Sequence, residues 1–191
     1  MRARAILALP LLLAAVTSAA SAELAEKVRA AVARSEGSVF MVKCLIAYEM
    51  GGQSGEAKVE VPAAVLDDSG LLVVPNPEQL LGAMAARATL QTKGFQLVLA
   101  DGKELDAKSV GRDSDTGLLF LRLNDPAGLV LKPLVAKADP LKLGDTLFLQ
   151  RRLSLTHPEM VCQAVRVTSV IQKPRVMSLV SANMGPGTLV L

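Results

Sequence analysis

The sequence predicts an all-β fold with a short helix near its N-terminus. Of the 191 residues, 51% are hydrophobic, which is enough to bury the core of one domain or of two small barrels that share an interface. Glycine and proline are plentiful, with 14 and 10 residues, and aromatic residues make up only 3%. That balance is typical of many short strands joined by turns. An Asp-Gly pair between two apolar runs, at 101–102, adds a strong signal for a β-hairpin.

The first 22 residues, 1–22, have the pattern of a cleavable signal peptide. Arg2 and Arg4 give a basic start, residues 5–16 are almost wholly apolar, and residues 20–22 form an Ala-Ser-Ala cleavage site. The apolar run falls well short of the ~20 residues that a membrane-spanning helix needs. We therefore expect a periplasmic or secreted protein that keeps no stable membrane anchor after cleavage.

Export changes the charge balance that bears on possible partners. The whole chain has 21 Lys and Arg against 18 Asp and Glu, and two of the arginines leave with the signal. The mature chain is then almost neutral, with no basic stripe and few aromatic residues to stack on bases. Nucleic acid is therefore not an expected partner.

The two cysteines leave two alternatives open. An oxidising compartment allows Cys44 and Cys162 to form a disulfide, yet both lie in apolar, strand-like runs, so two separate buried thiols are an equal alternative. Two cysteines without a nearby histidine do not make a metal site. The glycine pairs also lack the residues of a phosphate-binding loop, so we expect no cofactor.

The mature chain begins with a predicted helix and then changes to strands. Residues 23–36 are expected to be helical, because Leu24, Val28 and Val32 recur at helical spacing and fall on one face. Residues 37–123 are rich in β-branched residues and turn signals, which predicts a first β-barrel.

One short helix is expected to interrupt this first barrel. Residues 78–88 suit a helix of about two turns, with Asn76 as its N-cap and Pro77 tolerated in the first turn. Further on, the Asp-Gly pair at 101–102 predicts a type I′ turn. A fully apolar strand over 118–123 follows the turn "DSDTG".

Three prolines mark the boundary to a second β unit. Residues 124–140 are interpreted as a connector, and residues 141–191 as a second β-barrel. This second unit has only about 50 residues, whereas a closed six-stranded barrel usually takes roughly 70 or more. We therefore expect the second barrel to be incomplete or truncated, or to be completed by a partner or by another copy in a homo-oligomer.

The order of these elements resembles the trypsin-like serine proteases of the HtrA (Deg) type. From Phe95 to Leu123, "LVLADGKELDAKSVGRDSDTGLLFLRL" is similar to the family's pattern of a D-G turn, V-G-x-D and a strand D-L-A-L-L. The segments "PLKLGDTLFLQ" and "AVRVTSVI" resemble the strands that follow it. The resemblance covers most of the mature chain and implies a trypsin-like double β-barrel.

The catalytic positions of the family are occupied by other residues here. In the family a serine attacks the peptide carbonyl, a histidine takes its proton and an aspartate orients the histidine. The resemblance places the histidine at Pro77, the aspartate at Gly117 and the serine at Gly185. The single histidine of the chain, His157, lies beyond the connector, whereas the family takes its base from the first barrel.

The resemblance therefore implies a protease-shaped protein without catalytic residues. We expect an exported pseudoprotease that binds or regulates a peptide or protein, with the binding edge near residues 176–190 of the second barrel. The alternative is a divergent HtrA-like serine endopeptidase with an unrecognised catalytic set. In that case His157 is the only imidazole that could serve as a base.

Overall fold

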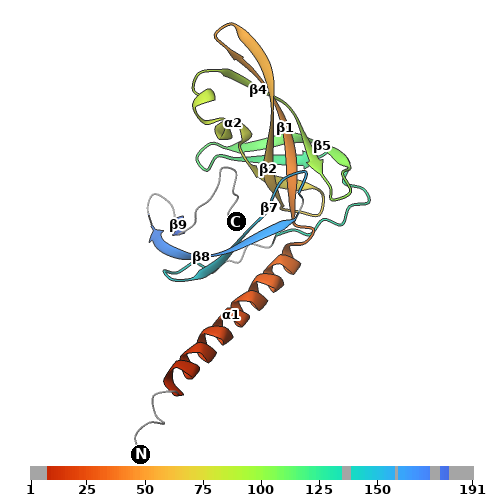
Figure 1. The fold of residues 1–191 in the computed structure, drawn as a ribbon. Coiled ribbons are helices and arrows are strands. Elements are labelled where there is room, and N and C mark those ends of the chain that lie inside the picture. Colours follow the sequence, from red (N-terminus) through yellow and green to blue (C-terminus); the bar gives the residue numbers. More distant parts are fainter. Residues whose placement is uncertain (1–7, 135–138, 158, 173–176, 181–191) are drawn as a thin grey trace, which may run out of the picture.

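The computed structural model describes residues 8–134, 139–157, 159–172 and 177–180. These form an N-terminal helix, a closed barrel of six strands and a separate sheet of three (Figure 1). The α-helices are α1 (Ala8–Ser35) and α2 (Pro77–Leu80), and a short 3-10 helix, η1 (Gly82–Met84), follows α2. The strands are β1 (Val39–Met50), β2 (Gln53–Val65), β3 (Leu71–Pro75), β4 (Thr89–Val98), β5 (Glu104–Asp113), β6 (Leu118–Leu123), β7 (Thr146–Arg152), β8 (Met160–Ile171) and β9 (Met177–Val180).

Helix α1 is longer than the sequence predicts. It starts at Ala8, so it runs through the predicted cleavage site and includes much of the predicted signal, and it ends at Ser35. Gly37 ends it with a positive φ of 82°, while the Ser38 amide donates to the Ser35 carbonyl at 2.9 Å. Among the described residues, no helix is both long and apolar enough to cross a membrane.

The barrel closes because its first strand has partners on both sides. The strand order is β1-β2-β3-β6-β5-β4, and β4 returns to pair with β1. Every pairing is antiparallel, and β1 shifts register against β4 between Leu45 and Ile46. Such a bulge bends a strand and increases its twist, which helps a sheet of six strands to close.

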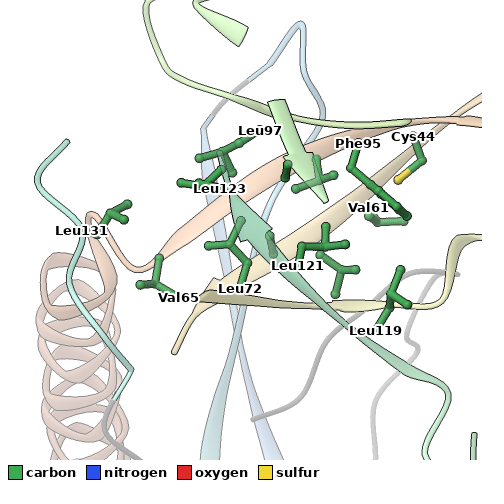
Figure 2. Packing of buried hydrophobic residues seen from close by; sticks show 14 residues of the cluster. Cys44, Val61, Val65, Leu72, Phe95, Leu97, Leu119, Leu121, Leu123 and Leu131 are labelled. Carbon is green, nitrogen blue, oxygen red and sulfur yellow. The ribbon is translucent and has the colours of Figure 1, made fainter. Parts of the chain in front are cut away.

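Alternating apolar residues fill the barrel. Because successive side chains of a strand point to opposite faces, every second residue of β1, β2, β4 and β6 turns inward. Figure 2 shows the resulting cluster. Its members include Val42, Cys44, Val61, Ala63, Val65, Leu72, Val74, Phe95, Leu97, Leu119, Leu121 and Leu123.

The hairpin between β4 and β5 is confirmed, but its predicted turn type is wrong. Gly102 has a φ of 82°, and no non-glycine residue in the described chain has a positive φ. A type I′ turn would need a positive φ at both central residues. Instead Gly102 N–H donates to the Leu99 carbonyl at 3.0 Å, and Leu99 N–H donates to the Lys103 carbonyl at 2.9 Å. The loop of the hairpin is thus one residue longer than that of a type I′ turn. Asp101 therefore does not need a positive φ.

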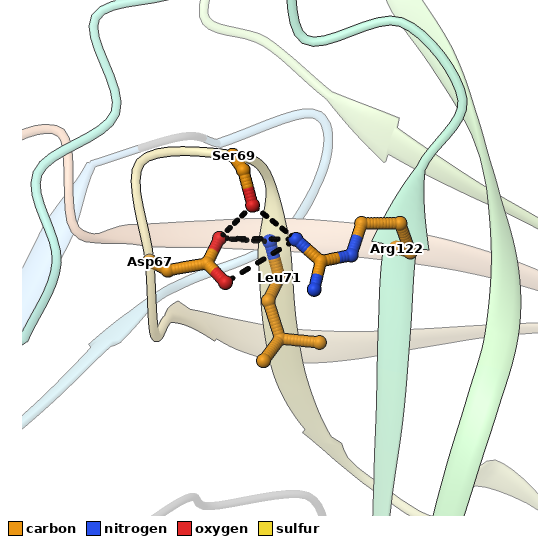
Figure 3. Close-up of polar contacts among 4 residues, drawn as sticks. All are labelled: Asp67, Ser69, Leu71 and Arg122. Atoms are coloured by element: carbon orange, nitrogen blue, oxygen red, sulfur yellow. Dashed lines mark hydrogen bonds and ion pairs between the residues drawn. The ribbon is translucent and has the colours of Figure 1, made fainter.

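The turn between β2 and β3 is fixed by one carboxylate. Asp67 accepts hydrogen bonds from the Leu71 amide at 2.9 Å and from the Ser69 hydroxyl at 2.8 Å, and it pairs with Arg122 of β6 at 3.2 Å (Figure 3). The Leu71 amide, and then Ser69 and Arg122, lower the pKa of the Asp67 carboxyl below its ordinary value of 3.8. The cluster joins the turn to the neighbouring strand.

The lowered pKa of Asp67 predicts a specific loss of stability in acid. A lowered folded-state pKa means that Asp67 contributes stability above the unfolded-state pKa, and that the contribution is lost as the pH falls through the folded-state pKa. Urea unfolding at about pH 6 and about pH 2.5 is expected to show a larger loss for the natural protein than for Asp67→Asn. Equal losses in the two proteins would contradict this role.

The second β unit contacts the barrel through the Arg152 side chain of β7 and a backbone amide of the loop after it. Arg152 donates from Nε to the Val39 carbonyl at 2.8 Å, and its guanidinium lies 5.9 Å from the centre of the Phe40 ring. The Leu155 amide donates to Glu60 at 3.0 Å. Within the described residues this unit has three strands, in the order β7-β8-β9, and is an incomplete barrel.

Candidate functional site

The structure brings together two of the three positions that the sequence predicts as substituted triad positions. Strand β3 ends at Pro75, and the next residue, Asn76, donates its amide to the Gly117 carbonyl at 2.8 Å. Pro77 and Gly117 therefore lie at one corner of the barrel, although forty residues separate them in the sequence. The third position, Gly185, lies outside the described residues.

Helix α2 fixes the position of Pro77. Asn76 caps it as predicted, because its side-chain oxygen accepts a hydrogen bond from the Glu78 amide at 3.2 Å. Pro77 is fully buried in the first turn. The helix is shorter than the predicted 78–88, since it ends at Leu80 and Gly82 follows with a φ of 52°.

Gly117 has a backbone conformation that favours glycine, and the end of the Gln79 side chain lies beside it. Its φ is 69°, in the left-handed region that other residues enter at a cost. A Cβ at this position would overlap with Oε1 of Gln79. An aspartate at 117 would therefore have to strain the backbone and displace the Gln79 side chain.

The turn before Gly117 is capped by a carboxylate with a structural role. Asp113 accepts hydrogen bonds from the amides of Asp115 at 3.0 Å and of Thr116 at 3.3 Å. This geometry is that of an Asx turn. Asp113, the aspartate of the V-G-x-D pattern, therefore orders the turn that carries Gly117.

The corner also contains an ion pair that the sequence did not reveal. Glu78 pairs with Arg112 of β5 at 2.9 Å, and its other carboxylate oxygen accepts a hydrogen bond from Thr92 of β4 at 3.0 Å. Both charged side chains are partly exposed, so the pair contributes at most about 1 kcal/mol. Its partners are 14 and 34 residues away from Glu78, and no local pattern marks such a contact.

A hollow of about 470 Å³ opens beside this network. Asn76, Glu78 and Gln79 line one side of it. Arg112 and Ser114 contribute from β5 and the turn after it, and three apolar residues complete the lining, Ala85, Ala88 and Leu90. Among the described residues, no group of His, Cys, Asp and Glu side chains is arranged to hold a metal ion.

Neither cysteine nor the histidine adds a reactive group to this corner. Cys44 and Cys162 are both free thiols in the structure, as in the second alternative that the sequence left open, but only Cys44 is buried and Cys162 is half-buried. Burial raises the pKa of the Cys44 thiol to about 12, so this thiol stays protonated and unreactive. His157 is exposed in the loop between β7 and β8, where its amide donates to the Ser154 hydroxyl at 3.0 Å.

Comparison with solved structures identifies the fold. The Rv3671c protease of M. tuberculosis in its active form matches 82% of this chain and 64% of its own length, with a TM-score of 0.55 and 16% identity. This chain has the trypsin-like protease fold. Deg5 matches it with a TM-score of 0.52 and 20% identity, over 81% of this chain and 72% of its own.

A third structure of the same fold is a variant of the HtrA-type protease AlgW with a tripeptide. It matches 82% of this chain and 46% of its own length, with a TM-score of 0.56 and 17% identity. This trypsin-fold chain thus spans less than two thirds of the length of the Rv3671c protease and of AlgW. No protein-family model and no curated protein matches the sequence.

Proposed function

We propose that this chain is an exported trypsin-fold pseudoprotease that binds a peptide or protein segment without hydrolysing it. The observation that carries the proposal is the corner after β3, where buried Pro77 follows the capping residue Asn76. By analogy with the family's sequence pattern, this corner would hold the general base. Proline has no side chain that can accept a proton.

The single histidine and the residue at position 117 support the same proposal. A serine hydroxyl is a poor nucleophile without an adjacent base, and the only imidazole of the chain belongs to His157, in an exposed loop of the second β unit. At Gly117, the backbone conformation and the Gln79 side chain oppose an aspartate. The corner consists of a helix cap, a buried proline and an ion pair, and these groups stabilise its conformation.

The mode of binding we propose is addition of an extended peptide to a strand of the second unit. Of the predicted binding region, residues 176–190, the structure describes β9, which pairs with β8 in an antiparallel register. A trypsin-fold structure similar to this chain, the AlgW variant, was solved with a tripeptide. Main-chain hydrogen bonds would supply the affinity in this mode.

The absence of hydrolysis can be tested directly. The mature protein, residues 23–191, is expected to leave casein intact and to take no label from a fluorophosphonate probe, with trypsin as the active control. Turnover or labelling that is lost when one named serine is replaced by alanine would overturn the proposal. If the activity also titrated near neutral pH and His157→Ala abolished it, the divergent endopeptidase would be the correct function.

A further inference from the structure

The hollow beside α2 contains a buried amide whose donor group is unused. Asn76 is only 4% exposed. Its Oδ1 accepts the hydrogen bond from the Glu78 amide, which fixes the orientation of the side-chain amide. Among the described residues, none accepts a hydrogen bond from Asn76 Nδ2.

The free donor must reach the surface, and Asn76 is one of the residues that line the hollow. Throughout the described part of the chain, every fully enclosed side-chain nitrogen or oxygen has a hydrogen-bond partner. Nδ2 has none, so it is not fully enclosed. Asn76 lines the hollow. Its N–H groups are therefore available to an acceptor that enters there.

The charges around the hollow favour an uncharged ligand. Its lining contains one acid and one base, Glu78 and Arg112, and these pair with each other at 2.9 Å. Both oxygens of Glu78 are engaged, one by Arg112 and the other by Thr92. An anionic ligand would have to compete with Glu78 for the guanidinium, and a cationic ligand would meet a carboxylate that is already neutralised.

The size and the apolar part of the lining suit a short peptide segment. The volume of about 470 Å³ is within the range of ligand pockets. The apolar residues of the lining are small or short, namely Ala85, Ala88 and Leu90. Such a wall leaves room for main-chain atoms and small side chains, while a single well-placed donor fixes the register.

We propose that this hollow binds an uncharged peptide segment, with one main-chain carbonyl oxygen accepting a hydrogen bond from Asn76 Nδ2. That the carbonyl belongs to a peptide rests on the proposed function, whereas the donor and the neutrality of the site come from the hollow itself. The site lies on the first barrel, apart from the strand edge of the second unit, and so assigns Asn76 as a second point of contact.

The direct test is a titration of the natural mature protein with N-acetyl-tetraalanine amide, followed by ¹⁵N nuclear magnetic resonance. The Asn76 side-chain NH₂ signals are expected to shift together with the backbone amides of residues 85–90 and 112–114. Acetate at the same concentrations is expected to leave them unchanged. Shifts confined to other residues, or an equal response to acetate, would overturn the proposal.

One variant tests the amide donor of Asn76 while keeping its role as the cap of α2. Asn76→Ser keeps an oxygen that can cap α2 but removes the amide donor, and we expect it to bind the capped peptide at least about fivefold more weakly. Asn124→Ser makes the same change at an exposed asparagine outside this hollow, and is expected to change the affinity less than about 1.5-fold. Equal affinity of Asn76→Ser and the natural protein would contradict the role of Asn76.

The outcomes distinguish this inference from the proposed function. Peptide binding that maps only to β8 and β9 would leave the pseudoprotease in place and remove the site at Asn76. Hydrolysis of the peptide, with shifts at Asn76, would remove the pseudoprotease and keep the site. If Asn76→Ser does not fold, the side-chain signals of the natural protein still decide the question.

Discussion

Replacing Leu121 with alanine is expected to lower the free energy of unfolding by about 3 kcal/mol. Leu121 lies in β6 with 0% exposure, opposite Leu72 of β3, and it belongs to the cluster that fills the barrel. The substitution removes buried apolar surface and leaves a cavity that strands on both sides cannot close, because the hydrogen-bonded ladder holds their spacing.

The matched control is the same substitution at an exposed leucine. Leu143 is 71% exposed, so Leu143→Ala is expected to change stability by less than about 0.5 kcal/mol. Urea unfolding of the natural protein and both variants, followed by circular dichroism, gives the comparison. A loss below about 1 kcal/mol for Leu121→Ala would mean that the barrel core is not packed around this residue.

Replacing Gly117 with alanine is expected to cost about 2 kcal/mol, from two separable causes. The first is the left-handed backbone, with a φ of 69°. The second is the overlap of the new Cβ with Gln79 Oε1. Because Gln79 has a flexible side chain, the second cause can be relieved by movement of that amide.

A second glycine and a double variant separate the two causes. Gly128 has a φ of 81° with nothing within 4 Å of its would-be Cβ, so Gly128→Ala is expected to cost only the backbone share, about 1 kcal/mol. In a Gln79→Ala background, the cost of Gly117→Ala should fall toward the same value. Thermal unfolding of the four variants measures this. An unchanged cost would show that Gln79 does not restrict position 117.

The features of the corner differ in how far the sequence could predict them. The cap at Asn76 was predictable, because asparagine before proline and glutamate is a signal that acts over three residues. The end of the helix was not, since an apolar stretch over 78–88 fits a longer helix, whereas the chain changes to a 3-10 helix over Gly82–Met84, where Gly82 has a positive φ. The pairing of Glu78 with Arg112 joins helix α2 to strand β5 and has no signature in the sequence around either residue.

The hairpin at 101–102 likewise has one feature that the sequence predicts and one that it does not. Its existence follows from Asp-Gly between apolar runs. Its turn type depends on the register in which β4 and β5 meet, with Val98 opposite Glu104, and this register leaves one residue more in the loop than the type I′ turn allows.

The sequence by itself determined that this protein is a β structure with a helix before it, where most of its turns fall and which residue caps α2. These depend on side-chain alternation, glycine and capping groups, whose effects extend over a few residues. Only the tertiary structure decided that β4 closes on β1, that Asn76 meets Gly117, and that Cys44 and Cys162 stay apart as free thiols. All three features concern residues far apart in the chain, whose positions are fixed by strand register and by the packing of the barrel as a whole.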